Sequence, residues 1–157
     1  MNETILDVLV YLFEHYMEAP AAEPPSEEAL RSELEEQGFD EEQIERAFDW
    51  LEELGERQES LPGVVAPGAI RIYTEAEVAR LDLEARGLLL DLEQRGVLDH
   101  RTRELVLDRL LALDEPHLGR EAAQWVALMV LFSEPGREAA YAWMRDYVYQ
   151  LPGGALH

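Results

Sequence analysis

The sequence predicts an all-α protein of about seven helices, in which an acidic N-terminal module of three helices packs with a C-terminal four-helix bundle. Two observations lead to this fold class. Apolar residues recur at helical spacing through most of the 157 residues, and the segments that carry them start at capping residues and stop at glycines. In addition, no two alternating segments offer a pair of strands. A chain of this length can bury roughly two thirds of its unfolded surface, which is enough for one core or two small ones.

Three parts are expected along the chain. Residues 1–55 form the acidic helical module, residues 56–73 form a loop with an extended lead-in, and residues 74–157 form the C-terminal bundle. The segment 56–69 contains two prolines and two glycines and is the predicted domain boundary. Residues 70–73 alternate as a short strand would, but they have no partner strand, so an extended lead-in is predicted there.

The first helix is predicted over residues 4–18, where Thr4 and Asp7 resemble a capping pair and apolar residues cover a broad face. A small proline-rich linker at residues 19–25 cannot continue this helix. The second helix, over residues 26–37, begins at a serine cap and ends at a glycine.

The third helix is predicted over residues 40–54. Asp40 and Gln43 form a capping box, while Phe39 and Ile44 stand at the two positions of a hydrophobic staple. A glycine follows the last apolar residue and is expected to end the helix. The second and third helices resemble a DNA-reading helix-turn-helix, but the would-be recognition helix begins with acidic residues, which disfavours contact with DNA.

A fourth helix is predicted over residues 74–96, beginning at a capping box of Thr74 and Glu77. Gly87 in its middle costs about 1 kcal/mol relative to alanine, and close packing of another helix is the usual reason to keep a glycine there.

Three more helices complete the bundle. Asp99 caps the fifth helix, the apolar run 125–132 forms the sixth, and the seventh follows Pro135 and Gly136. The run is too short to span a bilayer, so it should be the central core helix. Its residues expected to be buried are Trp125, Leu128, Met129 and Leu131.

Charge sets the class of partner. The chain has 34 acidic residues against 13 arginines and no lysine, a net charge of −21, and its first 60 residues alone carry 19 acidic residues and 3 arginines. A GC-rich genome or a saline cytoplasm would explain this composition without a function. The negative electrostatic potential of such a chain opposes binding to nucleic acid and to anionic lipid. A basic protein partner, or no partner, is the natural inference.

Sequence signals for catalysis, metals and cofactors are missing. There is no cysteine, and the four histidines are not spaced as metal ligands. No P-loop, dinucleotide fingerprint or nucleophile elbow occurs. We therefore expect no catalytic, cofactor-binding or metal-binding residues. The first twenty residues resemble neither a signal peptide nor a membrane span, so we expect a soluble, cytoplasmic protein.

Two groups of residues are candidates for partner binding. Arg101 and Arg103 belong to a basic cluster that could hold a phosphate or an acidic partner, although Glu104 and Asp108 lie at intrahelical pairing distance. Carboxylates on two adjacent helices could form a stripe that mimics DNA or steers cations, or could serve solubility alone. The stripe comprises Glu28, Glu35, Glu42, Glu45, Glu52 and Glu56, of which Glu42, Glu45 and Glu52 are the candidate binding residues.

A family resemblance begins at residues 71–114, RIYTEAEVARLDLEARGLLLDLEQRGVLDHRTRELVLDRLLALD, and continues in WVALMVLF and AYAWM. Together with the opening ILDVLVYLFEHY and the unit GFDEEQIERAFDWLEEL, these segments resemble the Smg family. The resemblance implies a cytosolic bacterial protein whose genes often lie near those for a DNA-processing factor and topoisomerase I. It supplies no catalytic residues.

These observations favour a non-enzymatic, cytosolic interaction or adapter protein with an unidentified, basic protein partner, and with no direct contact to nucleic acid or membrane. The alternative is a hydrolase- or transferase-type enzyme that uses scattered carboxylates together with Arg101 or Arg103.

Overall fold

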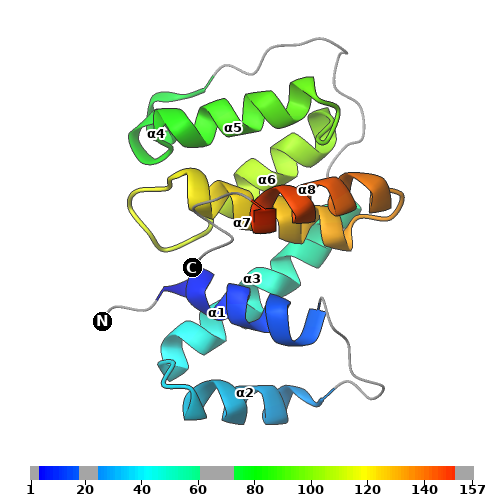
Figure 1. Ribbon diagram of the computed structural model, residues 1–157. Helices are drawn as coiled ribbons and strands as arrows, with labels where there is room; N and C mark the ends of the chain where they lie inside the picture. Colours follow the sequence, from blue (N-terminus) through cyan, green and yellow to red (C-terminus); the bar gives the residue numbers. More distant parts are fainter. Residues whose placement is uncertain (1–3, 18–24, 61–72, 151–157) are drawn as a thin grey trace. The chain divides into compact units, whose positions relative to one another are not determined.

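The computed structural model describes residues 4–17, 25–60 and 73–150, and the regular elements in these ranges are all helices (Figure 1). They are α1 (Ile5–Leu12), the π-helix η1 (Phe13–Met17), α2 (Glu27–Glu36), α3 (Glu41–Ser60), α4 (Glu75–Arg80), α5 (Leu83–Gln94), α6 (His100–Leu111), α7 (Arg120–Ser133) and α8 (Glu138–Gln150). The predicted all-α class is confirmed. The described ranges contain eight α-helices and the π-helix, where about seven helices were predicted, because the predicted first helix continues as a π-helix and the predicted fourth helix is interrupted.

The chain divides into two compact units, Met1–Gly55 and Glu56–His157. The first unit contains α1, η1, α2 and most of α3. The second contains the last turn of α3 and helices α4 to α8. Both units bury apolar side chains, for example Leu34 and Ala47 in the first and Leu89 in the second.

The caps predicted for the first two helices are confirmed. The Thr4 hydroxyl accepts the backbone N–H of Asp7, and the Asp7 carboxylate accepts the backbone N–H of Thr4 at 2.9 Å. Ser26 caps α2 by accepting the N–H of Ala29 at 3.1 Å. These side chains satisfy donors that the first turn of a helix leaves without a partner.

A tight corner at Gly38 joins α2 to α3. Gly38 has φ +98°, a left-handed conformation that glycine adopts without strain. Its N–H donates to Glu35 at 3.0 Å, and the next N–H, of Phe39, donates to Leu34 at 3.1 Å. This pair of bonds is the Schellman motif, which ends α2 where the glycine in the sequence predicts it.

Helix α3 does not end at Gly55 as predicted but continues to Ser60, so the first residues of the expected loop are helical. In the part of the chain that the structure describes, nothing within 4 Å would meet a Cβ at Gly55, and a glycine here costs the helix about 1 kcal/mol. A residue of α7 stabilises the last turn of α3, because the side-chain amide of Gln58 donates to the Ser133 hydroxyl at 2.8 Å. Tertiary hydrogen bonds therefore outweigh the local preference of the glycine.

The rest of the expected loop and lead-in, residues 61–72, lies outside the described residues. Tyr73, the last residue of the lead-in, precedes α4 without regular structure. The capping box predicted at Thr74 and Glu77 is confirmed.

The helix predicted over residues 74–96 is interrupted between α4 and α5. Leu81 is extended and fully buried, and the N–H of Asp82 donates to the carbonyl of Leu118 at 3.1 Å. The Asp82 carboxylate then caps α5 by accepting the N–H of Ala85 at 2.8 Å. An aspartate that caps in this way offers the backbone an alternative to a continuous helix. The prediction of one continuous helix over residues 74–96 is therefore wrong.

Gly87 does not lie in a close helix contact as predicted. It is exposed, and among the described residues nothing within 4 Å would meet a Cβ there. Leu83 and Leu90, on the same side of α5, are 75% and 50% exposed. Helix α5 buries its opposite side, so Leu83, Gly87 and Leu90 form an exposed apolar surface, the α5 face.

Helix α7 is the central helix of the second unit, in contact with α5, α6 and α8 (Figure 1). It buries Leu128, Met129 and Leu131 as predicted. Trp125 is only half-buried, contrary to the prediction, and its indole packs edge-on against the Tyr149 ring of α8. No helix in the described ranges has the length and apolarity needed to cross a membrane.

Candidate functional site

Four carboxylates follow one side of α3. Glu42, Glu45, Asp49 and Glu52 are spaced by three, four and three residues, and all four are exposed. This spacing keeps side chains on one face of a helix, over a length of about 15 Å. We call these residues the α3 carboxylate row. It contains the three predicted binding glutamates and adds Asp49, which the sequence analysis missed although it has the same helical spacing.

Two arginines touch the row. The Arg31 guanidinium of α2 donates to Glu45 at 2.7 Å, and Arg46 donates to Glu42 at 2.6 Å. These carboxylates are 57% and 66% exposed, so the ion pairs are weak and exchangeable. No cation in the described ranges pairs with Glu52. The other carboxylates of the predicted stripe are also exposed: Glu28 and Glu35 on α2, and Glu56, which belongs to the second unit.

A second group in the first unit surrounds Glu33, and we call it the tyrosine–glutamate cluster: Tyr11, His15, Tyr16, Glu33 and Phe39. The Tyr11 hydroxyl donates to Glu33 at 2.8 Å, and the Tyr16 hydroxyl donates to the same carboxylate. The His15 ring stacks on Tyr11 with centroids 4.1 Å apart, and Phe39 meets Tyr11 edge-on at 5.9 Å.

The π-helix explains how two tyrosines reach one carboxylate. Tyr11 and Tyr16 are five residues apart, which in an α-helix turns their side chains about 140° away from each other. A π-helix closes hydrogen bonds five residues apart and so brings such positions towards one face. The chain is π-helical over Phe13–Met17. No sequence signal predicts this winding, which is why the cluster was missed.

Hydrogen bonding shifts the ionisation of the cluster. Bonds from Tyr16 and Tyr11 hold the pKa of Glu33 below its ordinary value. The bond to Glu33, with burial and the negative charge beside it, raises the pKa of Tyr16 to about 12. Burial, followed by the bond to Glu33, also raises the pKa of Tyr11. The cluster therefore holds a charged carboxylate between two neutral phenols at neutral pH.

We expect Tyr16 to contribute less to stability at alkaline pH. Its pKa is 10.0 in the unfolded chain and about 12 in the folded one, so its contribution is fully present below pH 10 and is lost as the pH rises towards 12. Urea unfolding of the wild type and Tyr16→Phe at several pH values measures this difference. A difference that does not change above pH 10 would contradict the hydrogen bond.

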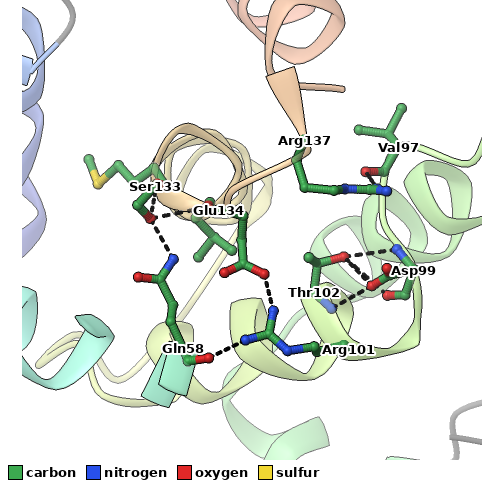
Figure 2. Close-up of polar contacts among 10 residues, drawn as sticks. Gln58, Val97, Asp99, Arg101, Thr102, Ser133, Glu134 and Arg137 are labelled. Carbon is green, nitrogen blue, oxygen red and sulfur yellow. Dashed lines mark hydrogen bonds and ion pairs between the residues drawn. The ribbon is translucent and has the colours of Figure 1, made fainter. Parts of the chain in front are cut away.

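Arg101 of α6 ties the last turn of α3 to the end of α7 (Figure 2). Its guanidinium donates to the Glu134 carboxylate and to the backbone carbonyl of Gln58. Glu134 is only 7% exposed, so the two charges neutralise each other at the edge of the core. Glu134 lies 33 residues from Arg101 along the chain, so helical spacing does not reveal it as a partner.

At the start of the same helix, Asp99 caps α6 as predicted. The N–H of Thr102 donates to the Asp99 carboxylate at 2.8 Å, and the Thr102 hydroxyl accepts the Asp99 N–H at the same distance (Figure 2). Burial opposes ionisation of Asp99, but these hydrogen bonds and the charges of Arg137 and Arg101 outweigh it and lower the pKa of Asp99.

Arg103 is a buried structural arginine. Its side chain is 5% exposed, and its guanidinium donates to both carboxylate oxygens of Glu93, at 2.9 and 3.1 Å, and to Glu104 at 3.1 Å. Arg101 and Arg103 are two residues apart on α6, a spacing that does not place side chains on one face. They hold different carboxylates, so the structure does not bring the two predicted arginines together.

An open groove of about 510 Å³ lies in the second unit, a feature that the sequence analysis missed. Its walls come from the turns after α5 and α7 and from α8. Arg95 lies over the Trp143 ring, 5.6 Å from its centroid, and Arg137 donates to the carbonyl of Val97. Within the described residues, no group of three or more histidine and acidic side chains could hold a metal ion.

Comparisons with known proteins identify the family. Residues 5–157 match the family described as "Protein of unknown function (DUF494)". The chain is 49% identical to "Protein Smg homolog" of Nitrosococcus oceani over 159 residues and 44% identical to that of Alkalilimnicola ehrlichii over 157 residues, with all of both chains covered. It is 47% identical over 149 residues to that of Xanthomonas campestris, with 95% of each chain covered. No solved structure matches the chain. With similarity that runs along the whole chain, this protein belongs to the Smg family.

Proposed function

We propose that this protein is a non-enzymatic, cytosolic interaction protein whose acidic first unit binds a basic protein partner. The α3 carboxylate row is the observation that carries the proposal. Its four exposed carboxylates lie along one side of a single helix, and the arginines that touch two of them do so in exposed ion pairs.

The charge of the first unit supports a cationic partner. Residues 1–55, which form this unit, carry a net charge of −15, against −6 for the rest of the chain. Such a field attracts a basic protein and speeds its association, while it repels phosphates of nucleic acids. Arginines or lysines of the partner can displace Arg31 and Arg46 from the carboxylates of the row. The displacement costs little free energy, because exposed ion pairs contribute about 1 kcal/mol or less.

The environment of Arg101 and Arg103 supports the absence of an active site. To bind a substrate anion, Arg101 would have to leave Glu134, and Arg103 would have to leave Glu93. Screening the purified protein against phosphate esters, peptides and nucleotides tests the enzyme alternative. Reproducible turnover that a single carboxylate substitution abolishes would overturn our proposal.

We expect replacement of Glu42, Glu45 and Glu52 together by glutamine to weaken partner binding while leaving the thermal midpoint unchanged or slightly raised. The substitution removes attraction to the partner and relieves repulsion within the row. Capture from the native cell on wild-type and variant protein in parallel, with quantitative mass spectrometry, measures the loss partner by partner.

The matched control removes three charges from the second unit. Glu84→Gln, Glu121→Gln and Asp146→Asn together change the net charge by the same amount, and all three residues are exposed. Proteins lost from the row variant but retained by the control are partners of the row. If both variants lose the same proteins equally, overall charge governs capture and the α3 row is not the binding surface.

A further inference from the structure

The tyrosine–glutamate cluster has the chemistry of a binding site for an arginine side chain. Building on the proposed function, we infer that the basic partner inserts one arginine at this cluster, with its guanidinium on the Glu33 carboxylate and against the Tyr11 ring. This contact gives the interaction a fixed anchor point beyond the long-range attraction of the α3 carboxylate row.

Glu33 differs from the carboxylates of the row in what holds it. Glu42 and Glu45 each face an arginine of their own chain, which reduces their net charge. Glu33 instead accepts hydrogen bonds from two neutral tyrosine hydroxyls, and no arginine in the described ranges pairs with it. The tyrosines therefore fix its orientation and leave its charge in place. Such a preoriented carboxylate loses little conformational freedom when it binds a cation.

Glu33 also keeps acceptor capacity for a ligand. An ionised carboxylate offers about four acceptor positions, and the two tyrosine hydroxyls occupy two of them. The remaining positions can accept N–H groups of a guanidinium in charge-assisted hydrogen bonds, which are about twice as strong as neutral ones. Glu33 is half-buried rather than enclosed, so a side chain from another protein can reach it.

Aromatic rings beside Glu33 favour arginine over lysine. Tyr11 is half-buried, its ring stacks on His15, and Phe39 meets it in a T-shaped contact. A guanidinium is planar, so it can stack on an aromatic face and donate to a carboxylate in the same plane, whereas an ammonium cannot. The same pairing already occurs within this unit, where Arg31 lies 4.8 Å from the centroid of the Phe48 ring.

The first arm of the test uses a synthetic oligoarginine peptide and the full chain. Its affinity is measured by fluorescence anisotropy for the wild type, Glu33→Gln and Glu36→Gln. Glu36 is an exposed glutamate on the same helix, so both variants lose one charge. We expect Glu33→Gln to weaken binding about fivefold and Glu36→Gln less than twofold. Equal losses would overturn the inference.

The second arm tests the aromatic contact. Tyr11→Leu removes the ring, while Tyr11→Phe keeps it and removes only the hydroxyl. We expect the leucine variant to weaken oligoarginine binding more than the phenylalanine variant, and to affect an oligolysine peptide less. Equal effects on the two peptides would overturn the role of the ring. Amide NMR spectra of each variant confirm the fold. If Glu33→Gln does not fold, the comparison of Tyr11→Leu with Tyr11→Phe still tests the inference, because equal losses of oligoarginine binding would overturn it.

The outcomes separate this inference from the proposed function. If the glutamine variant of Glu42, Glu45 and Glu52 weakens oligoarginine binding while Glu33→Gln matches its control, the row binds the basic partner and the cluster is only a structural tie between η1 and α2. If neither variant weakens binding, both proposals fail.

Discussion

Arg103→Met is expected to lower the free energy of unfolding by about 3 to 5 kcal/mol. The substitution keeps most of the apolar volume of the side chain but leaves the Glu93 carboxylate, which is 19% exposed, without the guanidinium that binds both of its oxygens. Removing the guanidinium from a buried ion pair leaves the carboxylate in a poorly solvated place where, in the described ranges, only the His100 ring pairs with it, at 3.1 Å, and this is what makes the loss large. Urea unfolding of the full chain at neutral pH measures it.

The double variant Arg103→Met with Glu93→Leu is the control for this effect. It removes both charges of this pair, and Glu104, the other carboxylate that Arg103 contacts, is 32% exposed and stays in contact with water. The double variant should therefore recover most of the loss, because a buried ion pair replaced by apolar residues of similar size is often neutral. If Arg103→Met alone costs less than about 1 kcal/mol, the guanidinium does not stabilise the fold, and Arg103 becomes available for a ligand.

Leu128→Ala is expected to cost about 2 to 5 kcal/mol of stability. Leu128 is fully buried in α7, the helix that contacts three others in the second unit, so its removal leaves a cavity that the surroundings fill only in part. Leu90→Ala is the matched control, because it makes the same change at a position on α5 that is 50% exposed. It should change stability by no more than about 0.5 kcal/mol.

A loss below about 1 kcal/mol for Leu128→Ala would show that α7 is not the core helix of the second unit. Chemical unfolding followed by circular dichroism measures both variants, and similar slopes against denaturant concentration show that they expose similar surface.

Elements specified by nearby residues were predictable. The capping boxes at Thr4 and Thr74 and the corner at Gly38 depend on residues three to five positions apart, and all occur as predicted. The two errors in helix boundaries depend on distant residues. Helix α3 passes through Gly55 because Ser133 and Arg101 hold its last turn, and the predicted fourth helix breaks where residues 80–82 meet Leu118.

The same distinction applies to the candidate sites. The α3 carboxylate row follows from helical spacing alone, and only Asp49 was overlooked. Arg101 and Arg103 lie two residues apart in the sequence, but the helix directs them to Glu134 and Glu93, which their own sequence neighbourhood does not reveal. The tyrosine–glutamate cluster was not predictable, because it needs π-helical winding and a carboxylate from the next helix.

The α5 face offers a contrasting mode of partner binding. Leu83, Gly87 and Leu90 are apolar and exposed, and a partner that bound there would gain from burial of apolar surface. Such binding does not weaken with salt, because screening acts on charges and not on the hydrophobic effect. The response to salt therefore distinguishes a partner of the acidic first unit from a partner of the α5 face.

The most direct test of the central claim is the affinity of the isolated partner for the full chain, measured by titration calorimetry between about 50 and 200 mM salt. Binding through the acidic first unit predicts that affinity falls steeply over this range, as expected for pairing of exposed charges. The glutamine variant of Glu42, Glu45 and Glu52 should show a shallower fall. An affinity that stays constant or rises with salt, in the wild type and the variant alike, would contradict the claim.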